Sequence, residues 1–313
     1  MEWDPSRFFR PSGSPSPYAL LILNQPINEK AFGVLSRYAS YIICADGGAN
    51  RLFDMPEVNE ESKLPDSIIG DLDSIRPAVR EHYEKLGVSV LQDPDQYSTD
   101  FTKCLKYLNA HATEIIASPR KGKPTNGANG STSTSPSDQS PLEIVILGGL
   151  GGRVDQAFSQ VHHLYMMTQT QRSIRENETS SPDANPAAGG NLYLVSEESI
   201  TFIIQTGKNT IHTPATRRSD VTASSDVSES PRKRKREQEQ KEPEYFFEEN
   251  IGIIPLSAPA KITTHGFEWD VENWHTEIGG NLSTSNHIRA EKVEVETSVP
   301  VLFTVELAER LKR

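Results

Sequence analysis

Short apolar segments rich in β-branched residues alternate with helical patterns from residue 18 to about residue 196, and this alternation limits the possible folds more than any other feature. We predict strands at residues 19–23, 41–45, 67–69, 88–91 and 144–147. One helical face gathers Phe101, Cys104, Leu105 and Leu108, and another gathers Val154, Ala157, Phe158, Val161 and Tyr165. Strands that alternate with helices indicate a mainly parallel sheet covered on both faces, which is a three-layer α/β/α domain.

After residue 196 the pattern changes to closely spaced β-type segments at residues 200–204, 251–256, 260–264, 292–297 and 301–305. Such spacing predicts an antiparallel β-sandwich. A chain of 313 residues is long enough for two domains. We therefore expect an α/β domain at residues 18–197 and a β-sandwich domain at residues 198–313.

Three segments, 118–140, 176–190 and 214–243, contain few apolar residues and many Gly, Ser, Thr, Pro or charged residues. Segments of this composition bury too little apolar surface to fold, so we predict three disordered surface insertions. The last contains the basic run Arg232 to Arg236, which fits a nuclear-localisation or polyanion-binding patch. Because acidic residues follow it, a solvated charged loop is the favoured interpretation.

The net charge of −11 argues against nucleic-acid binding, which needs a basic surface to displace counterions from phosphates. Only two cysteines occur, so no disulfide framework is implied and a reducing compartment fits best. The chain has neither a basic start followed by an apolar segment nor a run of about 18 apolar residues that would span a bilayer. We expect a soluble cytoplasmic protein without membrane or nucleic-acid partners, with nuclear localisation left open by the basic run.

Aspartate and glycine gather where four consecutive predicted strands end. The four exits are Asp46 to Arg51, Gly70 to Ser74, Asp93 to Asp100 and Gly148 to Gln156. In an open α/β sheet, ligands bind at the carboxyl ends of the strands, so the side chains at these exits are expected to lie close together. Gathered carboxylates repel one another unless a cation lies among them, and Mg²⁺ prefers such oxygen ligands. The pattern predicts a Mg²⁺ site made by Asp46, Asp71, Asp73 and Asp100.

The same strand exits carry groups suited to phosphate binding. Glycines such as Gly47, Gly148 and Gly149 allow backbone N–H groups to approach a phosphate closely, and Arg51 or Arg153 can neutralise its charge. Positioning and charge neutralisation are what phosphoryl transfer requires. Each motif alone also has a structural explanation, as a turn, a helix cap or a flexible loop, but their common edge favours a functional site.

Aromatic residues in the β region have two interpretations. Phe267, Trp269 and Trp274 fit the core of a sandwich, which is the default, but a tryptophan near the polar residues 283–286 also suits stacking on a flat cationic ring. The paired histidines at 162–163 lie on a predicted helix without an acidic partner at metal-ligand spacing. We interpret them as exposed or core-edge residues.

The four strand exits resemble, in order and spacing, the signature segments of eukaryotic thiamine pyrophosphokinases. The segments concerned are Asp46 to Arg51, Gly70 to Ser74, Asp95 to Lys103 and Gly148 to Gln156. The stretch from Thr263 to Asn286 resembles the thiamine-binding sandwich of that family. The match spans most of the chain outside the three insertions, which fall between the motifs.

The resemblance implies transfer of the pyrophosphoryl group of ATP to the hydroxyl of thiamine, giving thiamine diphosphate and AMP. It implies that Asp71, Asp73 and Asp100 hold or orient Mg²⁺, with Asp46 nearby. The nucleotide-binding residues it implies are Gly47, Asn50, Arg51, Gln96, Thr99, Gly148, Gly149, Arg153, Asp155 and Gln156. Those implied for thiamine are Trp269, as a stacking ring, with Ser283, Ser285 and Asn286. It also implies a homodimer with its active sites at the subunit interface.

Two other enzyme classes are disfavoured because their motifs are missing. The first predicted strand is followed by Asn24-Gln25-Pro26 instead of the Gly-x-Gly-x-x-Gly turn of a nicotinamide dehydrogenase. The Gly-x-x-x-x-Gly-Lys-[Ser/Thr] loop of P-loop kinases does not occur. The remaining alternative is a non-catalytic thiamine- or nucleotide-binding regulator, which we would expect to have lost some metal carboxylates, whereas all four are present.

Overall fold

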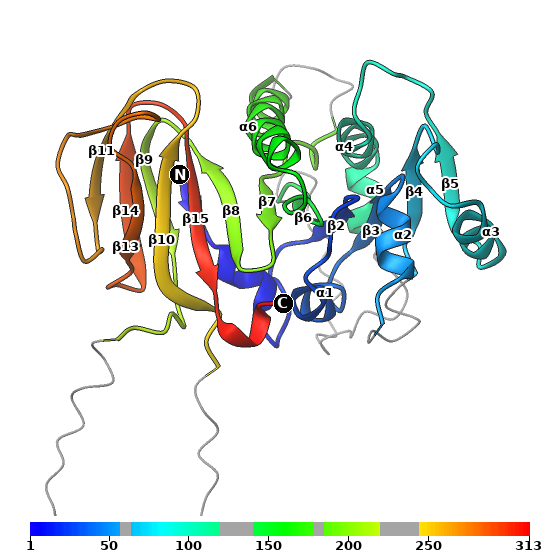
Figure 1. Cartoon of the computed structure of the whole chain (residues 1–313), viewed down its shortest axis with the longest axis horizontal. Coiled ribbons are helices and arrows are strands. Elements are labelled where there is room, and N and C mark those ends of the chain that lie inside the picture. Colours follow the sequence, from blue (N-terminus) through cyan, green and yellow to red (C-terminus); the bar gives the residue numbers. More distant parts are fainter. Residues whose placement is uncertain (57–63, 119–139, 178–184, 220–243) are drawn as a thin grey trace, which may run out of the picture. The chain divides into compact units, whose positions relative to one another are not determined.

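The computed structural model describes residues 1–56, 64–118, 140–177, 185–219 and 244–313 (Figure 1). The chain divides into two compact units, which we describe separately. The α/β unit comprises residues 7–203 and 310–313, and the β-rich unit comprises residues 1–6 and 204–309. Short 3-10 helices span Pro5–Phe9 and Glu309–Leu311. No helix in the described part of the chain is both long and apolar enough to cross a membrane.

A mainly parallel sheet forms the centre of the α/β unit. Its strands are β2 (Tyr18–Ile22), β3 (Tyr41–Ala45), β4 (Ser67–Gly70), β5 (Ser89–Gln92), β6 (Glu143–Leu147), β7 (Leu192–Val195) and β8 (Ser199–Ile204). They lie in the order β8-β7-β6-β2-β3-β4-β5, and every neighbouring pair is parallel except β7 with β8. All five strands predicted for this region are present.

The direction of winding reverses at β2. From β2 the chain continues through β3 and β4 to β5 on one side, and then returns to place β6 and β7 on the other side. Neighbouring strand exits diverge at such a switch point, and ligands of open α/β sheets bind in the resulting crevice. The carboxyl ends of β2 and β6 therefore mark the position where a site is expected.

Helices cover the sheet of the α/β unit. They are α1 (Glu29–Leu35), α2 (Gly48–Phe53), α3 (Pro77–Lys85), α4 (Asp100–Ala110), α5 (Ala112–Ala117) and α6 (Val154–Asn177). Helix α4 packs on β3 and β4, α2 on β2 and β3, and α6 on β7. Every residue of β2 is buried, as expected for a strand covered on both faces.

The apolar face predicted for α6 is wrong in part. Val154 and Phe158 are 72% and 69% exposed, whereas Leu164, which was outside that face, is fully buried. The first turns of α6 direct their polar side chains toward the end of the sheet instead, as described below. Helical periodicity identified the element but not the side that it buries.

The β-rich unit contains two groups of strands. One sheet has the order β1-β9-β14-β11-β12, formed by β1 (Glu2–Trp3), β9 (Gly207–His212), β14 (Lys292–Thr297), β11 (Ala260–His265) and β12 (Trp274–Thr276). In the other group, β10 (Phe247–Pro255) pairs antiparallel with β13 (Ser283–His287) and with β15 (Val301–Leu307). Burial alternates along β11 and β14, so each has one core face. The mixed α/β class with a β-rich second domain is confirmed.

Most of the three predicted insertions lies outside the described residues, as does the basic run. At the edges of two of these segments the structure differs from the prediction. Helix α6 extends to Asn177, Ala187 and Ala188 are buried, and Thr216 is buried and bridges to Phe247. Small residues permit this close packing; a Cβ atom at Gly190 would lie 1.9 Å from the carbonyl oxygen of Leu142. The composition of these edge residues resembles that of a disordered segment, but in the structure they are packed.

Candidate metal and nucleotide site

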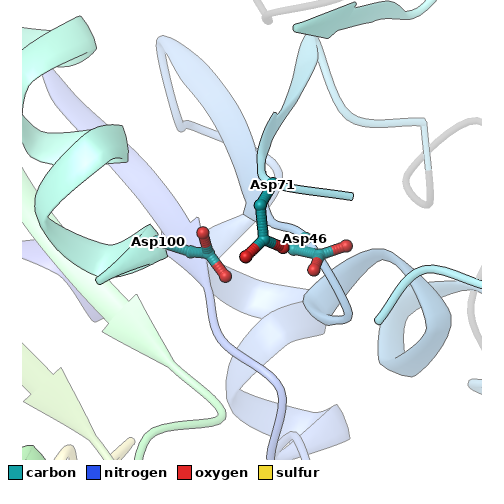
Figure 2. A group of neighbouring side chains, drawn as sticks. All are labelled: Asp46, Asp71 and Asp100. Atoms are coloured by element: carbon teal, nitrogen blue, oxygen red, sulfur yellow. The ribbon is translucent and has the colours of Figure 1, made fainter. Parts of the chain in front are cut away.

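Three aspartates converge at the carboxyl edge of the parallel sheet and form what we call the acidic triad. Asp46 follows β3, Asp71 follows β4, and Asp100 is the first residue of α4. Carboxylate oxygens from all three lie within 4.8 Å of one another (Figure 2). Parallel strands bring their exits to one edge, so the proximity predicted for these three residues is present.

Asp46 is the buried and fixed member of the triad. It is 1% exposed, its backbone has φ 40°, and its carboxylate oxygens accept hydrogen bonds from the backbone N–H groups of Ser74 (3.0 Å) and Ile75 (2.9 Å). Burial raises the pKa of Asp46, while these two amide donors oppose the rise. A left-handed backbone is costly for a non-glycine residue and tends to persist at functional sites. The hydrogen bonds therefore hold this carboxylate in one orientation.

Asp71 is a partly exposed member of the triad. Its Oδ1 accepts a hydrogen bond from the backbone N–H of Asp73 (3.2 Å), and its Oδ2 accepts one from Gln96 (3.1 Å). The amide of Asp73 is the main cause of the lowered pKa of Asp71, with the Gln96 side chain adding to it. Asp71 is therefore held in the charged form that a metal ion needs. Gln96, predicted as a nucleotide ligand, here orients a triad member.

Lys103 is a buried cation beside the triad that the sequence analysis did not identify. It is 3% exposed, and its Nζ donates to Oδ1 of Asp100 at 3.1 Å. Burial alone would lower the pKa of Lys103, but the hydrogen bond and charge of Asp100 outweigh it, so the pKa is raised. The ammonium group thus offsets part of the repulsion among the carboxylates. Its one sequence signal is its place one helical turn after Asp100.

Gly70 provides the space in which the triad fits. A Cβ atom at this position would lie 2.6 Å from Cβ of Asp46 and 3.0 Å from Oδ1 of Asp100. The donor set around this space consists only of oxygen atoms, which suits Mg²⁺, an ion commonly bound through one or two carboxylates together with substrate phosphates. The residues present therefore fit a magnesium ion.

Asp73, the fourth predicted carboxylate, does not join the triad. Its Oδ1 accepts a hydrogen bond from the hydroxyl of Ser74 (2.8 Å), and its backbone N–H donates to Oδ1 of Asp71 (3.2 Å). The intervening Leu72 has φ 66°. The left-handed backbone conformation of Leu72 turns the chain. Asp71 therefore belongs to the triad, whereas Asp73 does not.

A cavity of about 220 Å³ lies at the switch point. Asn24 and Gln25 line it from the end of β2, and Phe101 from the start of α4. Five predicted residues also line it: Thr99, Asp100, Gly148, Gly149 and Gln156. Residues that the sequence analysis missed, besides Asn24 and Gln25, are Ser159, Gln160 and His163 of α6. The recurrence of polar residues at 156, 160 and 163 was a usable signal for this face of the helix.

Three predicted nucleotide ligands, Gly47, Asn50 and Arg51, do not line the cavity and contact other residues of the site. Asn50 accepts a hydrogen bond from the Arg76 backbone (3.0 Å) and donates to the Ser74 carbonyl (2.9 Å), so it secures the loop that follows β4. Arg51 donates to the Asn24 side chain at 3.1 Å. Gly47 is close enough to Asn24 that a Cβ atom would lie 2.3 Å from Nδ2 of that side chain.

Arg153 and Asp155 pair with each other on the surface. The guanidinium donates two hydrogen bonds to the carboxylate, at 3.1 and 2.6 Å, and this pairing lowers the pKa of Asp155. Both side chains are largely exposed. The Arg153 guanidinium, which was predicted to bind a phosphate, is therefore paired with Asp155 in this structure.

All four predicted thiamine residues line one cavity of about 320 Å³ in the β-rich unit: Trp269, Ser283, Ser285 and Asn286. Trp274 also lines it. Trp269 is 54% exposed and Phe267 is 5% exposed. The aromatic cluster is thus divided, because Phe267 belongs to the core and Trp269 is available to a ligand.

Asn286 positions Trp269 through its backbone. The Asn286 carboxamide accepts a hydrogen bond from the Trp269 N–H (3.1 Å) and donates to the Trp269 carbonyl (2.9 Å). The indole lies beside the ring of His287, with centroids 5.1 Å apart, and Nδ1 of His287 lies 2.6 Å from Glu268. Arg289 contacts both Glu268 and Glu249, which extends this polar support.

Replacing Glu249 with Gln is expected to weaken the β-rich unit in a pH-dependent way. Burial alone would raise the pKa of Glu249, but hydrogen bonds from Ser219 and the Arg289 guanidinium outweigh it and lower the pKa to about 2, from an ordinary value of 4.5. The carboxylate therefore stabilises the fold above pH 4.5, and this contribution is lost as pH falls toward 2. We expect a loss of roughly 1–3 kcal/mol at pH 7 and a much smaller one near pH 3.

Tryptophan fluorescence during urea unfolding measures this effect, because all three tryptophans lie in the β-rich unit. Glu248→Gln serves as the control, since Glu248 is the neighbouring acid and its Oε1 accepts a hydrogen bond from the backbone N–H of Glu309 at 3.3 Å. A loss of stability in Glu249→Gln that is the same at pH 3 and pH 7 would contradict the assignment.

The α/β unit carries a carboxylate site made only of oxygen ligands, and the β-rich unit has an aromatic cavity. These features define a class of two-unit proteins with the type of site used in phosphoryl transfer. Family models for the thiamin pyrophosphokinase catalytic domain and for the thiamin pyrophosphokinase vitamin B1 binding domain match residues 32–175 and 235–302. The chain belongs to the thiamine pyrophosphokinase family, which confirms the resemblance found in the sequence.

Individual relatives agree with this placement. Thiamine pyrophosphokinase 3 of Oryza sativa subsp. japonica is 30% identical over 304 residues, which cover 93% of this chain and 87% of the relative. The thiamine pyrophosphokinase of Saccharomyces cerevisiae is 27% identical over 312 residues, covering 92% and 85%. A structure of thiamin pyrophosphokinase from Candida albicans aligns with a TM-score of 0.69 and 25% identity, covering 98% of this chain and 93% of that one.

Proposed function

We propose that this chain transfers the pyrophosphoryl group of ATP to the hydroxyl of thiamine, giving thiamine diphosphate and AMP. The observation that carries the proposal is the acidic triad at the carboxyl edge of the sheet, in a chain of the thiamine pyrophosphokinase family. In this reaction the thiamine oxygen bonds to the β-phosphorus of ATP, the bond from that phosphorus to the α–β bridging oxygen breaks, and AMP leaves. The hydroxyl proton is released to a base or to solvent.

Asp46, Asp71 and Asp100 are the proposed ligands of Mg²⁺, and Asp73 supports them from the same loop. When bound, Mg²⁺ supplies charge neutralisation at the phosphate oxygens. The protein's own contribution is orientation. The backbone amides of Ser74 and Ile75 fix Asp46, Gln96 fixes Asp71, and Lys103 holds Asp100.

The nucleotide is proposed to occupy the switch-point cavity, where Thr99, Gly148, Gly149 and Gln156 meet it. Gly47, Asn50 and Arg51 act by shaping the adjoining loop. Arg153 and Asp155 are proposed to contact the phosphates after their mutual pair opens. ATP is thus the co-substrate in this proposal.

Thiamine is proposed to stack on Trp269, with Ser283 and Ser285 as polar contacts and Asn286 as the residue that positions the indole. A tryptophan face attracts a flat cation, and thiamine carries a positively charged thiazolium ring. We further propose a homodimer with active sites at the subunit interface, and a cytoplasmic location. The alternative of nuclear localisation rests on residues 232–236, which lie outside the described part of the chain.

The nucleotide released from ATP tests the proposed function. Purified protein is incubated with ATP, Mg²⁺ and thiamine, and the products are separated by chromatography. We expect AMP. Release of ADP would indicate simple kinase chemistry, and thiamine binding without turnover would favour a non-catalytic regulator.

Trp269→Ala is expected to raise KM for thiamine about tenfold and to change KM for ATP less than twofold, because the stacking surface is lost while the α/β unit is untouched. Steady-state kinetics with each substrate varied in turn measures both constants. Trp269→Phe is the matched variant and should retain part of the affinity. An unchanged KM for thiamine in Trp269→Ala would contradict the assignment.

A further inference from the structure

Trp274, the first residue of β12, adds a second indole to the cavity of about 320 Å³ in the β-rich unit, which we call the aromatic cavity. Trp274 pairs with Ile262 of β11, and directly opposed residues of antiparallel strands place their side chains on the same face of a sheet. Ile262 and Thr264 on this face are buried and line the cavity. The opposite face carries the exposed residues Lys261 and His275. The strand pairing therefore accounts for the position of Trp274 at the cavity.

The two indoles of the aromatic cavity differ in their exposure to solvent. Trp269 is 54% exposed, whereas Trp274 is only partly exposed and lies opposite the buried Ile262. None of the described residues that line the cavity carries a charge, so no lining carboxylate offsets a positive charge on a ligand. Moving a charged group out of water costs more free energy than moving a neutral one. A cationic ring therefore suits the more exposed Trp269, and a neutral ring suits Trp274.

The chemistry of thiamine matches this difference between the indoles. Thiamine has a cationic thiazolium ring and a neutral aminopyrimidine ring, joined by one methylene carbon. Because this carbon is tetrahedral, the two rings do not share a plane, and a single indole face covers only one of them. Heterocyclic bases stack on aromatic side chains because each base has a π face. With the thiazolium on Trp269, as proposed above, the aminopyrimidine requires a second surface.

We infer that Trp274 is a specificity-determining residue that provides the stacking surface for the aminopyrimidine ring of thiamine. Ser283 and Ser285 of β13 line the same cavity, and their hydroxyl groups suit the ring nitrogens and the amino group of this pyrimidine. The inference rests on the proposed function, because it takes thiamine as the ligand. In this assignment the two tryptophans recognise different chemical features of one substrate.

Calorimetric titration of thiamine into the protein tests the inference. The buffer contains Mg²⁺ and the unreactive α,β-methylene analogue of ATP, so binding is measured without turnover. Trp274→Leu, which keeps an apolar side chain but loses the aromatic face, should bind thiamine about tenfold more weakly than wild type. Trp274→Phe should retain most of the affinity. Trp274→Met provides the same comparison if Trp274→Leu does not fold.

The two halves of thiamine separate the roles of the tryptophans. The aminopyrimidine with a hydroxymethyl group and the N-methylated hydroxyethyl thiazolium are each titrated in the same buffer. Trp274→Leu should weaken binding of the pyrimidine half about tenfold and binding of the thiazolium half less than twofold, and Trp269→Leu should do the reverse. Equal losses for both halves in Trp274→Leu, or a loss for the thiazolium half alone, would contradict the assignment.

Ile278→Ala is the matched control. Ile278 is a 63% exposed apolar residue that follows β12 and does not line the aromatic cavity. This variant should bind thiamine like wild type. Unchanged thiamine binding in Trp274→Leu would overturn the inference. Thiamine binding that depends on Trp274, without any formation of AMP from ATP, would overturn the proposed function and leave this inference standing.

Discussion

Asp71→Asn is expected to lower kcat by roughly 10²–10³-fold while the protein remains folded. The substitution removes the charge of a partly exposed triad carboxylate, and with it a ligand proposed for Mg²⁺. An amide oxygen at this position can still accept the hydrogen bond from the Asp73 backbone, so the loop keeps its shape. Steady-state turnover with saturating ATP and thiamine measures the loss, and circular dichroism confirms the fold.

Asp54→Asn is the matched control for this charge change. Asp54 ends α2 as an exposed carboxylate paired with Arg76, outside the triad. Its replacement should change kcat less than twofold. Equal activity of Asp71→Asn and Asp54→Asn would remove the triad from the proposed metal site.

Gly70→Ala is expected to abolish most activity with only one added carbon. The new methyl group would lie 2.6 Å from Cβ of Asp46, and Asp46 cannot move freely because two backbone amides hold its carboxylate. The triad must open instead, and displacement of catalytic groups by about 1 Å can cost a factor of about 100 in rate. We also expect a loss of about 1–3 kcal/mol of stability from overpacking. Turnover assays and thermal unfolding measure the two effects.

Gly33→Ala provides the control for Gly70→Ala. Gly33 lies within α1, where a Cβ atom would meet nothing within 4 Å. The same substitution there should leave turnover unchanged and raise the free energy of unfolding by about 0.5–1 kcal/mol, because alanine favours a helix more than glycine does. Normal activity in Gly70→Ala would show that the space around Gly70 is not needed by the triad.

The acidic triad could be predicted from sequence because topology alone brings its members together. Asp46 and Asp71 each follow a strand of one parallel sheet, and Asp100 begins the helix that packs on those strands. The carboxyl ends of neighbouring parallel strands meet at one edge whatever the exact side-chain packing is. An error of one or two residues in a strand boundary does not alter this conclusion.

Side-chain roles within the site could not be predicted in the same way, because they depend on single dihedral angles and on burial. The φ of 66° at Leu72 separates Asp73 from the triad, although both aspartates belong to one short motif. Lys103 is charged yet buried, which contradicts the usual preference of lysine for the surface. Asn286 supports the backbone of Trp269, a role that residue type alone does not indicate.

Two strands of the β-rich unit also lacked a usable sequence signal. The β13 segment Ser283–His287 contains no apolar residue, so period-2 alternation is absent. The β1 segment pairs in parallel with β9, with Glu2 opposite Thr210, a partner far away in the chain. Local patterns report which residues are apolar, whereas pairing between distant segments is decided by the packing of the whole unit.

A single ³¹P NMR experiment with purified wild-type protein, ATP, thiamine and Mg²⁺ tests the proposed reaction most directly. The proposal predicts that thiamine diphosphate and AMP accumulate in equal amounts, and that neither forms when excess EDTA removes the metal. Thiamine monophosphate with ADP, or undiminished turnover in EDTA, would contradict it.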